Sequence, residues 1–307
     1  MRKAGFTLAT VPPYDFDLTA AYATYFKGAY GAESFVHGAF RRLFDLDHVL
    51  CLATVSSMAG ADSPLLRVEL QGESLSKNAS TEVLRQLSNL LGIEQDLAPF
   101  YGMASQDARL APLVNAFRGL HVPQAPTVFE ALILAILGQQ ISSGAARTLR
   151  SSLIRTFGKK SVIEGAPYYA FPCAEALSAA GMKRLRSIGL SLRKAEYVLN
   201  IAQMVARGDF DLEGLRKVPD EEVIRVLSEI RGVGKWTANW ILIRALGRTD
   251  GFPDTDLALL RVLGKLLNRD APEALEYAAR WSPFRSYVTT YLFAAVRSGR
   301  FDELYHR

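Results

Sequence analysis

The sequence predicts an α+β protein in which a small N-terminal α/β domain with an antiparallel sheet precedes an all-α region. Two observations predict this order. Stretches with the composition and alternation of β-strands are confined to the first hundred residues. From about residue 99 onward, helical patterns follow one another and are separated by Gly and Pro. We therefore expect an N-terminal α/β domain over residues 1–100 and an all-α region over residues 101–307.

The N-terminal domain combines strand and helix patterns. Strand-type content marks the segments Phe6–Val11, His48–Ser56 and Leu65–Leu70. Helical spacing of apolar residues marks the segments Leu18–Phe26 and Thr81–Leu91. The small and turn-forming residues of Ala59–Pro64 predict a hairpin loop.

In the second region, the helix that follows Thr127 has the clearest start signal. Thr127 and Glu130 form a T-x-x-E capping box, and the apolar run Ala131–Leu137 comes next. A helix that is apolar on every side is expected at the buried centre of its domain, and this run is far too short to span a bilayer. Further helices are expected at Ala145–Thr156, Ala174–Ala180, Leu192–Ala206, Glu221–Ile230 and Leu257–Leu267.

Positive charge gathers in the second region. The chain has 36 Lys/Arg and 31 Asp/Glu, which gives a net charge of +5. Residues 1–100 carry 8 Lys/Arg against 11 Asp/Glu, whereas residues 101–307 carry 28 against 20. If phosphate is the partner, the second region is the part that meets it. An ordinary solvated surface of mixed charge is the alternative.

Cysteine and histidine are too few and too scattered for a metal site. The two cysteines, Cys51 and Cys173, form no CxxC motif, which argues against a disulfide framework and against a four-cysteine iron–sulfur or zinc site. The four histidines are His37, His48, His121 and His306. None has a partner at ligand spacing, so no side-chain metal site is expected. No signal-peptide pattern precedes residues 5–10, which predicts that the chain stays where it is made.

A glycine-rich hairpin at residues 230–236 joins two helical patterns. Gly232 and Gly234 break the first helix, and Lys235 begins the second. Glycines let the backbone approach a ligand, and the N-terminus of the following helix offers N–H groups that suit a phosphate. Lys235 and the Thr237 hydroxyl could add phosphate contacts. Taken alone, the same pattern also fits an ordinary helix–turn–helix corner.

Two tryptophans, Trp236 and Trp240, lie one turn apart on the second helix. One stripe of this helix is apolar and is enough to dock it: Ala238, Ile241, Leu242 and Ala245. The tryptophans and Ile243 form another stripe, which is either core or the wall of a pocket. Their place directly after a phosphate-type hairpin favours the pocket, because aromatic faces suit a nucleic-acid base.

An acidic turn follows about twenty residues after the hairpin and carries Asp254 and Asp256. An Asp before a helix usually caps it, and the helix over 257–267 needs one cap. The other carboxylate therefore needs a different role, and a carboxylate suits chemistry.

These segments together resemble the helix–hairpin–helix DNA glycosylases, most closely the alkylation-repair branch typified by DNA-3-methyladenine glycosylase II. The matching blocks are PPYDF (12–16), FEALILAILGQQIS (129–142), GLSLRKAEY (189–197), GVGKWTAN (232–239) and RWSPFRSY (280–287). Because several blocks occur in the family's order, the resemblance covers most of the chain and does not depend on one motif. It implies a helix–hairpin–helix glycosylase region over 101–307, with the active site between two helical subdomains.

The resemblance also implies roles for individual residues. The family's catalytic aspartate falls on Asp256, with Leu259 and Arg261 at the family's spacing, so Asp254 is left as the helix cap or a supporting group. The aromatic base pocket maps to Trp236, Trp240, Phe293 and, from the first domain, Tyr22. DNA contacts map to Gly232, Gly234, Lys235, Thr237 and Gln140, the last at the position where the family inserts a side chain into the gap left by the flipped base.

The implied activity is hydrolysis of the N-glycosidic bond of alkylated purines such as 3-methyladenine, without strand cleavage. Relatives that also cut the strand carry a Schiff-base lysine where this chain has Trp236, and Lys235 is one residue away, about 100° around the helix. The missing cysteines separate the chain from the iron–sulfur branch. The implied partner is double-stranded DNA with alkylated bases, bound by a monomer that is cytoplasmic and nucleoid-associated if its source is bacterial. No cofactor is implied, apart from a monovalent cation that the hairpin's carbonyls could hold.

Two alternatives stay open from sequence. One is an oxidised-purine glycosylase with lyase activity, against which the absent lysine argues. The other is a non-catalytic helix–hairpin–helix DNA-binding protein, which needs the hairpin but no pocket. A pocket beside Asp256 lined by Trp236 and Trp240 would distinguish an enzyme from such a protein.

Overall fold

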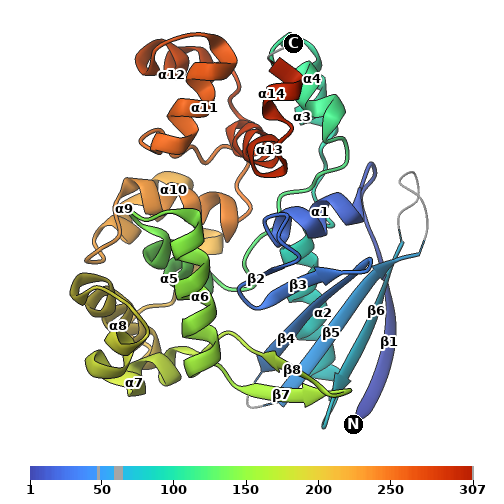
Figure 1. Cartoon of the computed structure of the whole chain (residues 1–307), viewed down its shortest axis with the longest axis vertical. Helices are drawn as coiled ribbons and strands as arrows, with labels where there is room; N and C mark the ends of the chain where they lie inside the picture. The colour runs from blue at the N-terminus through green and yellow to red at the C-terminus, as the bar shows by residue number, and fades with distance from the viewer. Residues whose placement is uncertain (47–48, 59–64, 306–307) are drawn as a thin grey trace.

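Within the residues that the computed structural model describes, 1–46, 49–58 and 65–305, six strands pair into one antiparallel sheet (Figure 1). The strand order is β1-β6-β5-β4-β3-β2. The strands are β1 (Arg2–Ala9), β2 (Ala29–Tyr30), β3 (Glu33–Val36), β4 (Ala39–Leu46), β5 (Val49–Ser57) and β6 (Leu65–Gly72). The predicted α+β fold with an N-terminal antiparallel sheet is therefore confirmed. The predicted loop at Ala59–Pro64 lies outside the described residues.

Buried and exposed side chains alternate in the first part of β6, which explains why the sequence predicts this strand. Leu66, Val68 and Leu70 are fully buried, whereas Arg67 between them and Leu65 before them are exposed. The buried side chains point toward two helices, α1 (Phe16–Ala23) and α2 (Lys77–Leu91), which cover one face of the sheet. A strand with one buried and one solvated face produces this period of two.

The other face of the sheet is partly covered by a short β-hairpin from the second region. Its strands are β7 (Lys160–Ile163) and β8 (Ala166–Tyr169). Ile163 and Ala170 pack there against Leu43 and Leu52 of the sheet. The expectation of an all-α second region is corrected: the region is mainly helical and contains this hairpin. Its two turn residues, Glu164 and Gly165, both have positive φ, as tight hairpin turns require.

Helices make up most of the second region. They are α3 (Ala98–Ser105), α4 (Ala111–Ala116), α5 (Val128–Gly138), α6 (Ser143–Phe157), α7 (Ala174–Ser187), α8 (Leu192–Ala206), the 3₁₀ helix η1 (Glu213–Lys217), α9 (Asp220–Ser228), α10 (Lys235–Arg244), α11 (Leu257–Leu267), α12 (Ala271–Ala279), α13 (Arg285–Ser298) and α14 (Phe301–Tyr305). The first of them begins two residues before position 100, and the boundary at that position stays a prediction. None of the helices in the described ranges is long and apolar enough to cross a membrane.

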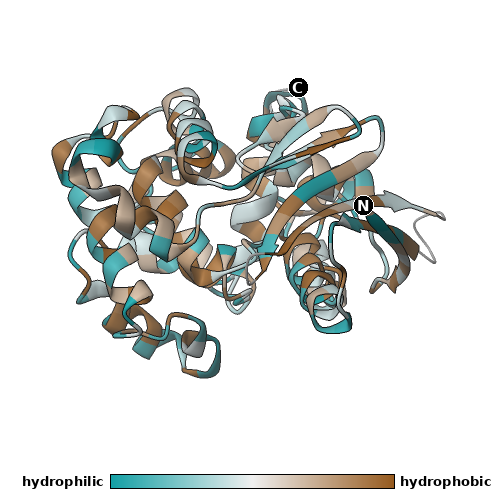
Figure 2. Ribbon diagram, turned by 90° about the horizontal axis from the view of Figure 1, so that it is seen from below, coloured by the Kyte–Doolittle hydropathy of each residue, from teal (hydrophilic) through white to brown (hydrophobic). Residues whose placement is uncertain are grey.

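The helices form two packed groups. Side chains of α5 to α10 make one core, and side chains of α3, α4 and α11 to α14 make another. Helix α5 is the centre of the first: Leu132, Ile133, Ile136 and Leu137 are fully buried. Figure 2 shows hydrophobic colour along the strands and through the helical part, with hydrophilic stretches toward the outside. The site described below lies where the two helical groups and the sheet domain meet.

Ion pairs attach the sheet domain to the helical part. Arg42 of β4, 3% exposed, contacts the carboxylates of Glu33 in β3 and Glu130 at the start of α5. Thr127 accepts the N–H of Glu130, as its capping box predicts, but the Glu130 carboxylate is engaged by Arg42. Lys159 and Asp45 form a further pair at 2.9 Å. The contact between Arg42 and Glu130 joins the sheet domain to α5, and α5 forms one wall of the site.

Candidate active site

The hairpin between α9 and α10 depends on its two glycines in different ways. Gly232 has φ +94°, and a Cβ there would lie 2.4 Å from the ring of Tyr197, so only glycine fits. Gly234 is the N-cap of α10, and a Cβ there would meet no atom within 4 Å. Because the first N–H groups of a helix lack partners within it, this open end suits an anion such as a DNA phosphate.

Gln139, which sequence reasoning missed, connects the end of α5 to this hairpin. Its Nε2 donates to the carbonyl of Gly232 at 2.9 Å and to Oγ1 of Thr237 at 3.1 Å. Thr237 is 1% exposed, so its hydroxyl faces Gln139 and is not free for the predicted phosphate contact. Lys235 is exposed and reaches Asp254 at 2.9 Å.

Four hydrogen bonds hold the carboxylate of Asp256. Oδ1 accepts the backbone N–H groups of Ala258 and Leu259, both at 2.9 Å. Oδ2 accepts the indole N–H of Trp236 at 2.9 Å and that of Trp240 at 3.2 Å. All four partners are donors, an arrangement that suits a charged carboxylate.

This geometry corrects the assignment of the two aspartates. Of the two roles open to Asp254, helix cap or supporting group, the first is excluded because Asp256 itself is the N-cap of α11. One carboxylate serves both purposes because one oxygen caps the helix while the other faces the tryptophans. Asp254 pairs with Lys235 instead.

The tryptophans form an aromatic wall together with Phe293 of α13. The rings of Trp236 and Trp240 are 6.4 Å apart and nearly perpendicular, and the ring of Trp240 lies 5.7 Å from that of Phe293. Asp256, these three rings and Gln140 line one cavity of about 870 Å³. Gln140 is exposed and has φ +54°. A cavity of this size lies within the range of small-molecule pockets and is ample for a single base.

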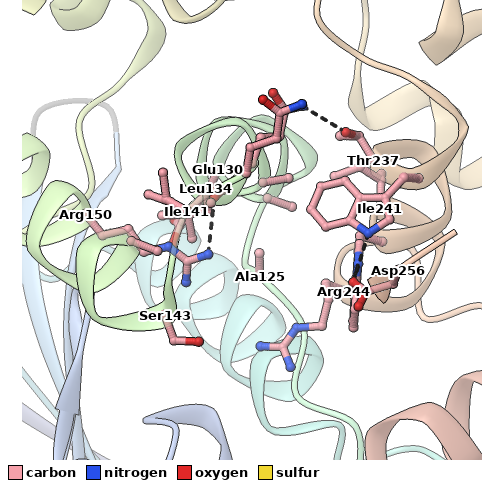
Figure 3. A pocket seen from close by; sticks show the side chains of 18 of the residues that line it. Ala125, Glu130, Leu134, Ile141, Ser143, Arg150, Thr237, Ile241, Arg244 and Asp256 are labelled. Atoms are coloured by element: carbon pink, nitrogen blue, oxygen red, sulfur yellow. Dashed lines mark hydrogen bonds between the residues drawn. The ribbon is translucent and has the colours of Figure 1, made fainter. Parts of the chain in front are cut away.

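The cavity extends between α5 and α6 on one side and α10 and α11 on the other. Figure 3 shows Arg150 and Arg244 reaching toward it from opposite sides. Lys194 of α8 also lines it and donates to the carbonyl of Leu137 at the end of α5 at 2.8 Å. Burial lowers the pKa of the Lys194 ammonium.

The predicted contribution of Tyr22 is corrected. Tyr22 is 1% exposed and packs in the hydrophobic core behind the cavity wall, whereas Tyr25 and Tyr30 line the cavity. Helix α1 ends at Ala23, and Tyr25 and Phe26 both have positive φ, so the chain turns there. The expected helix over Leu18–Phe26 could not show this. The sequence signal that could have indicated this turn is Gly28, a turn-forming residue between Tyr25 and Tyr30.

The structure supports no side-chain metal site among the residues that it describes. Cys51 and Cys173 are free thiols. The cation on the hairpin's carbonyls stays a prediction. The carbonyls of Gly232 and Gly234 each accept one hydrogen bond already, so a cation would have to use their second lone pairs.

The chain matches known proteins over the same segments. The model of the HhH-GPD superfamily base excision DNA repair proteins matches residues 133–283, which contain the hairpin and Asp256. A DNA-3-methyladenine glycosylase of Bacillus subtilis is 33% identical over 219 residues, 70% of this chain and 72% of that protein.

Two solved structures extend the likeness to the fold. The 3-methyladenine DNA-glycosylase of Archaeoglobus fulgidus has 27% identity and a TM-score of 0.81, over 95% of this chain and 98% of that one. The 3-methyladenine DNA glycosylase of Schizosaccharomyces pombe in complex with abasic DNA has 26% identity and a TM-score of 0.53, over 62% of this chain and 92% of that one.

Proposed function

The chain belongs to the HhH-GPD superfamily of base excision DNA repair proteins, and we propose that Asp256 is the carboxylate with which it breaks the N-glycosidic bond of an alkylated base. Its activity is that of a 3-methyladenine DNA glycosylase. The observation that carries the proposal for Asp256 is its position at the cavity, with Oδ2 hydrogen-bonded to both Trp236 and Trp240.

The chemistry follows from the bond to be broken. A base inside a duplex cannot present its glycosidic bond to an enzyme, so it must be extruded into a pocket. Methylation at N3 or N7 makes a purine cationic, and it then leaves as a neutral base without a general acid. A negative charge fixed beside the sugar stabilises the oxocarbenium-like transition state. We assign this role to Asp256, which can also orient or deprotonate the attacking water.

The aromatic wall supports the proposed substrate class. A cationic base is attracted to the electron-rich faces of aromatic rings, by about 0.5–2 kcal/mol per ring. Trp236, Trp240 and Phe293 supply such rings at the cavity. A non-catalytic DNA-binding protein would need neither this wall nor a carboxylate tied to it.

Duplex DNA is the proposed partner, held by the open N-terminus of α10. Gly234 leaves that end unobstructed, and Lys235 lies beside it with an exposed side chain. Gln140, exposed at the cavity with a left-handed backbone, is the side chain proposed to occupy the gap left by the flipped base. Residues 101–307 carry the chain's excess of positive charge, which suits a polyanion.

We further propose that the enzyme releases the base without cutting the strand. Strand cleavage in the resembling lyases needs a lysine at the position of Trp236, and the neighbouring Lys235 is paired with Asp254. Incubation with DNA methylated on its purines tests both parts of the proposal. Chromatography should show free 3-methyladenine, and borohydride should trap no covalent enzyme–DNA adduct. Absence of base release would overturn the proposed substrate, and a trapped adduct would overturn the monofunctional assignment.

A further inference from the structure

Three arginines without carboxylate partners lie at one end of the cavity. Arg150 of α6, Arg244 of α10 and Arg297 of α13 all line it, and no ion pair joins any of them to an acid among the described residues. Nη1 of Arg297 and Nε of Arg150 are buried without a hydrogen-bond partner. Positive charge is therefore concentrated at this part of the cavity.

Two tyrosines are held within this arginine cluster. The rings of Tyr25 and Tyr30 stack with centroids 3.9 Å apart and planes 16° from parallel. The guanidinium of Arg297 lies 3.9 Å from the ring centre of Tyr25, and that of Arg150 lies 4.8 Å from the ring centre of Tyr30.

The cluster adjoins the aromatic wall directly. Arg297 also lies 5.1 Å from the ring centre of Phe293, which packs against Trp240. A base that stacks in the pocket therefore comes close to these arginines. For a cationic methylated base, the positive charges of these arginines oppose binding, because like charges repel strongly in a partly desolvated site.

The surroundings of Tyr25 favour its charged form. Burial alone would raise the pKa of its phenol, but the charges of Arg297, Arg150 and Arg244 outweigh burial and lower that pKa to about 6. Burial and the neighbouring Tyr25 raise the pKa of Tyr30 to about 12, so one member of the stack carries the charge. Glu33 and Glu130 line the same cavity and share one partner, Arg42, so these three groups together keep one negative charge.

We propose that Tyr25 is a specificity-determining residue of the base pocket: its phenolate oxygen offsets the charge of the three arginines and so allows a cationic methylated base to bind. This rests on the proposed function, which supplies the cationic substrate. The guanidinium groups of Arg297 and Arg150 lie over the ring of Tyr25, where their charge favours the phenolate.

The test compares two bases of the same shape that differ in charge. Duplexes carry 7-methyladenine, a cation, or 7-methyl-7-deazaadenine, its neutral counterpart, each on a 2′-fluorinated sugar that slows base loss. Dissociation constants are measured near neutral pH for the wild type and for Tyr25→Phe. We expect Tyr25→Phe to lower the preference for the cation by about tenfold, the effect of one neighbouring charge that shifts an ionisation by roughly one pKa unit.

Two further variants separate charge from damage to the pocket. Tyr30→Phe removes a hydroxyl from the same stack but no charge, so the preference for the cation should stay as in the wild type. Arg297→Gln removes the charge that does most to lower the pKa of Tyr25, so the ionisation of Tyr25 should move to higher pH. A loss of preference in Tyr30→Phe equal to that in Tyr25→Phe would overturn the proposal, as would an ionisation of Tyr25 that Arg297→Gln leaves unchanged.

The ultraviolet absorbance of tyrosinate provides a readout that needs no ligand. In a pH titration of the wild type, one tyrosine should ionise with a midpoint near 6, and Tyr25→Phe should lack this step. Equal weakening of both duplexes in Tyr25→Phe, or a titration unchanged by it, would overturn the proposal. If the wild type releases methylated bases but Tyr25→Phe shows neither the expected loss of preference nor the missing ionisation, the proposed function stands and only the role of Tyr25 is wrong.

Discussion

The indole N–H of Trp236 donates to Oδ2 of Asp256 at 2.9 Å, so the wall of the pocket also positions the carboxylate. The other oxygen, Oδ1, is fixed by the first turn of α11. Neither oxygen can rotate without breaking a hydrogen bond. The carboxylate is therefore oriented before a substrate arrives, and a preorganised charge costs no reorganisation during the reaction.

Removal of the Trp236 donor should slow base release. Trp236→Phe keeps an aromatic ring but frees Oδ2 from its shorter bond, and we expect the single-turnover rate to fall by roughly 10- to 100-fold, less than the loss of a direct transition-state contact. Trp240→Phe removes the longer bond, at 3.2 Å, and should cost less. A wild-type rate in Trp236→Phe would show that the indole does not position the carboxylate.

The two hairpin glycines should fail in different ways when each is changed to alanine. Gly232→Ala places a Cβ against Tyr197 at a positive φ, so we expect it to lower the free energy of unfolding by about 1–3 kcal/mol. Gly234→Ala meets no neighbour and should fold normally, but it should weaken binding to abasic duplex DNA, because the added methyl lies at the phosphate side. Urea unfolding measures the stability of both variants, and DNA titration measures their binding. Equal stability of the two variants would contradict the distinct roles of the two glycines.

The neighbouring residues Gln139 and Gln140 offer a second matched pair. Gln139→Leu removes two hydrogen bonds and leaves the buried Thr237 hydroxyl without its donor, so the free energy of unfolding should fall by about 1–3 kcal/mol. Gln140→Leu alters an exposed side chain and should change stability by less than about 0.5 kcal/mol. Thermal or urea unfolding of both variants measures the two losses of stability. Equal losses would mean that Gln139 does not hold the hairpin.

Sequence periodicity predicts the helices well where packing and local signals agree. The bounds expected for Leu192–Ala206 and Leu257–Leu267 are those of α8 and α11. The start of α5 at Thr127 is also confirmed, because its N-cap hydrogen bond is local. The hairpin β7–β8 escaped prediction because its strands are four residues long and gain their core only against Leu43 and Leu52, far away in the sequence.

In the candidate site too, features set by local sequence could be predicted, and features set by contacts between distant segments could not. The hairpin, the tryptophans and Asp256 lie within one stretch of sequence, so spacing and resemblance suffice to single them out. The arginine cluster could not be predicted in this way, because Arg150, Arg244 and Arg297 come from three helices and meet only in the folded chain. Tyr25 was missed because its orientation depends on a left-handed turn that a helical pattern does not reveal.

His121 should make the stability of the protein depend on pH. It is fully buried, with Nδ1 2.6 Å from the carbonyl of Gly92 and Nε2 3.1 Å from that of Pro13. Burial lowers the pKa of its imidazole below 6.5. Below about pH 6.5, the unfolded chain therefore takes up a proton that the folded chain does not, and stability falls as the pH drops through that window.

The measurement is urea unfolding at a series of pH values between neutral and mildly acidic. The contribution of His121 should be a loss of at most about 1.4 kcal/mol per pH unit. His121→Gln should flatten the pH dependence, whereas His37→Gln, which changes an exposed histidine, should leave it unchanged. A wild-type slope in His121→Gln would contradict the assignment.

Single-turnover release of 3-methyladenine from a defined duplex by Asp256→Asn, measured beside the wild type and Asp254→Asn, tests the central claim most directly. The amide in Asp256→Asn keeps the shape of the side chain but removes its negative charge, so the rate should fall by at least about 10²–10³-fold while binding to abasic DNA is preserved. Asp254→Asn breaks only the pair with Lys235 and should retain most of the rate. A near-normal rate in Asp256→Asn would contradict the claim that this carboxylate breaks the glycosidic bond.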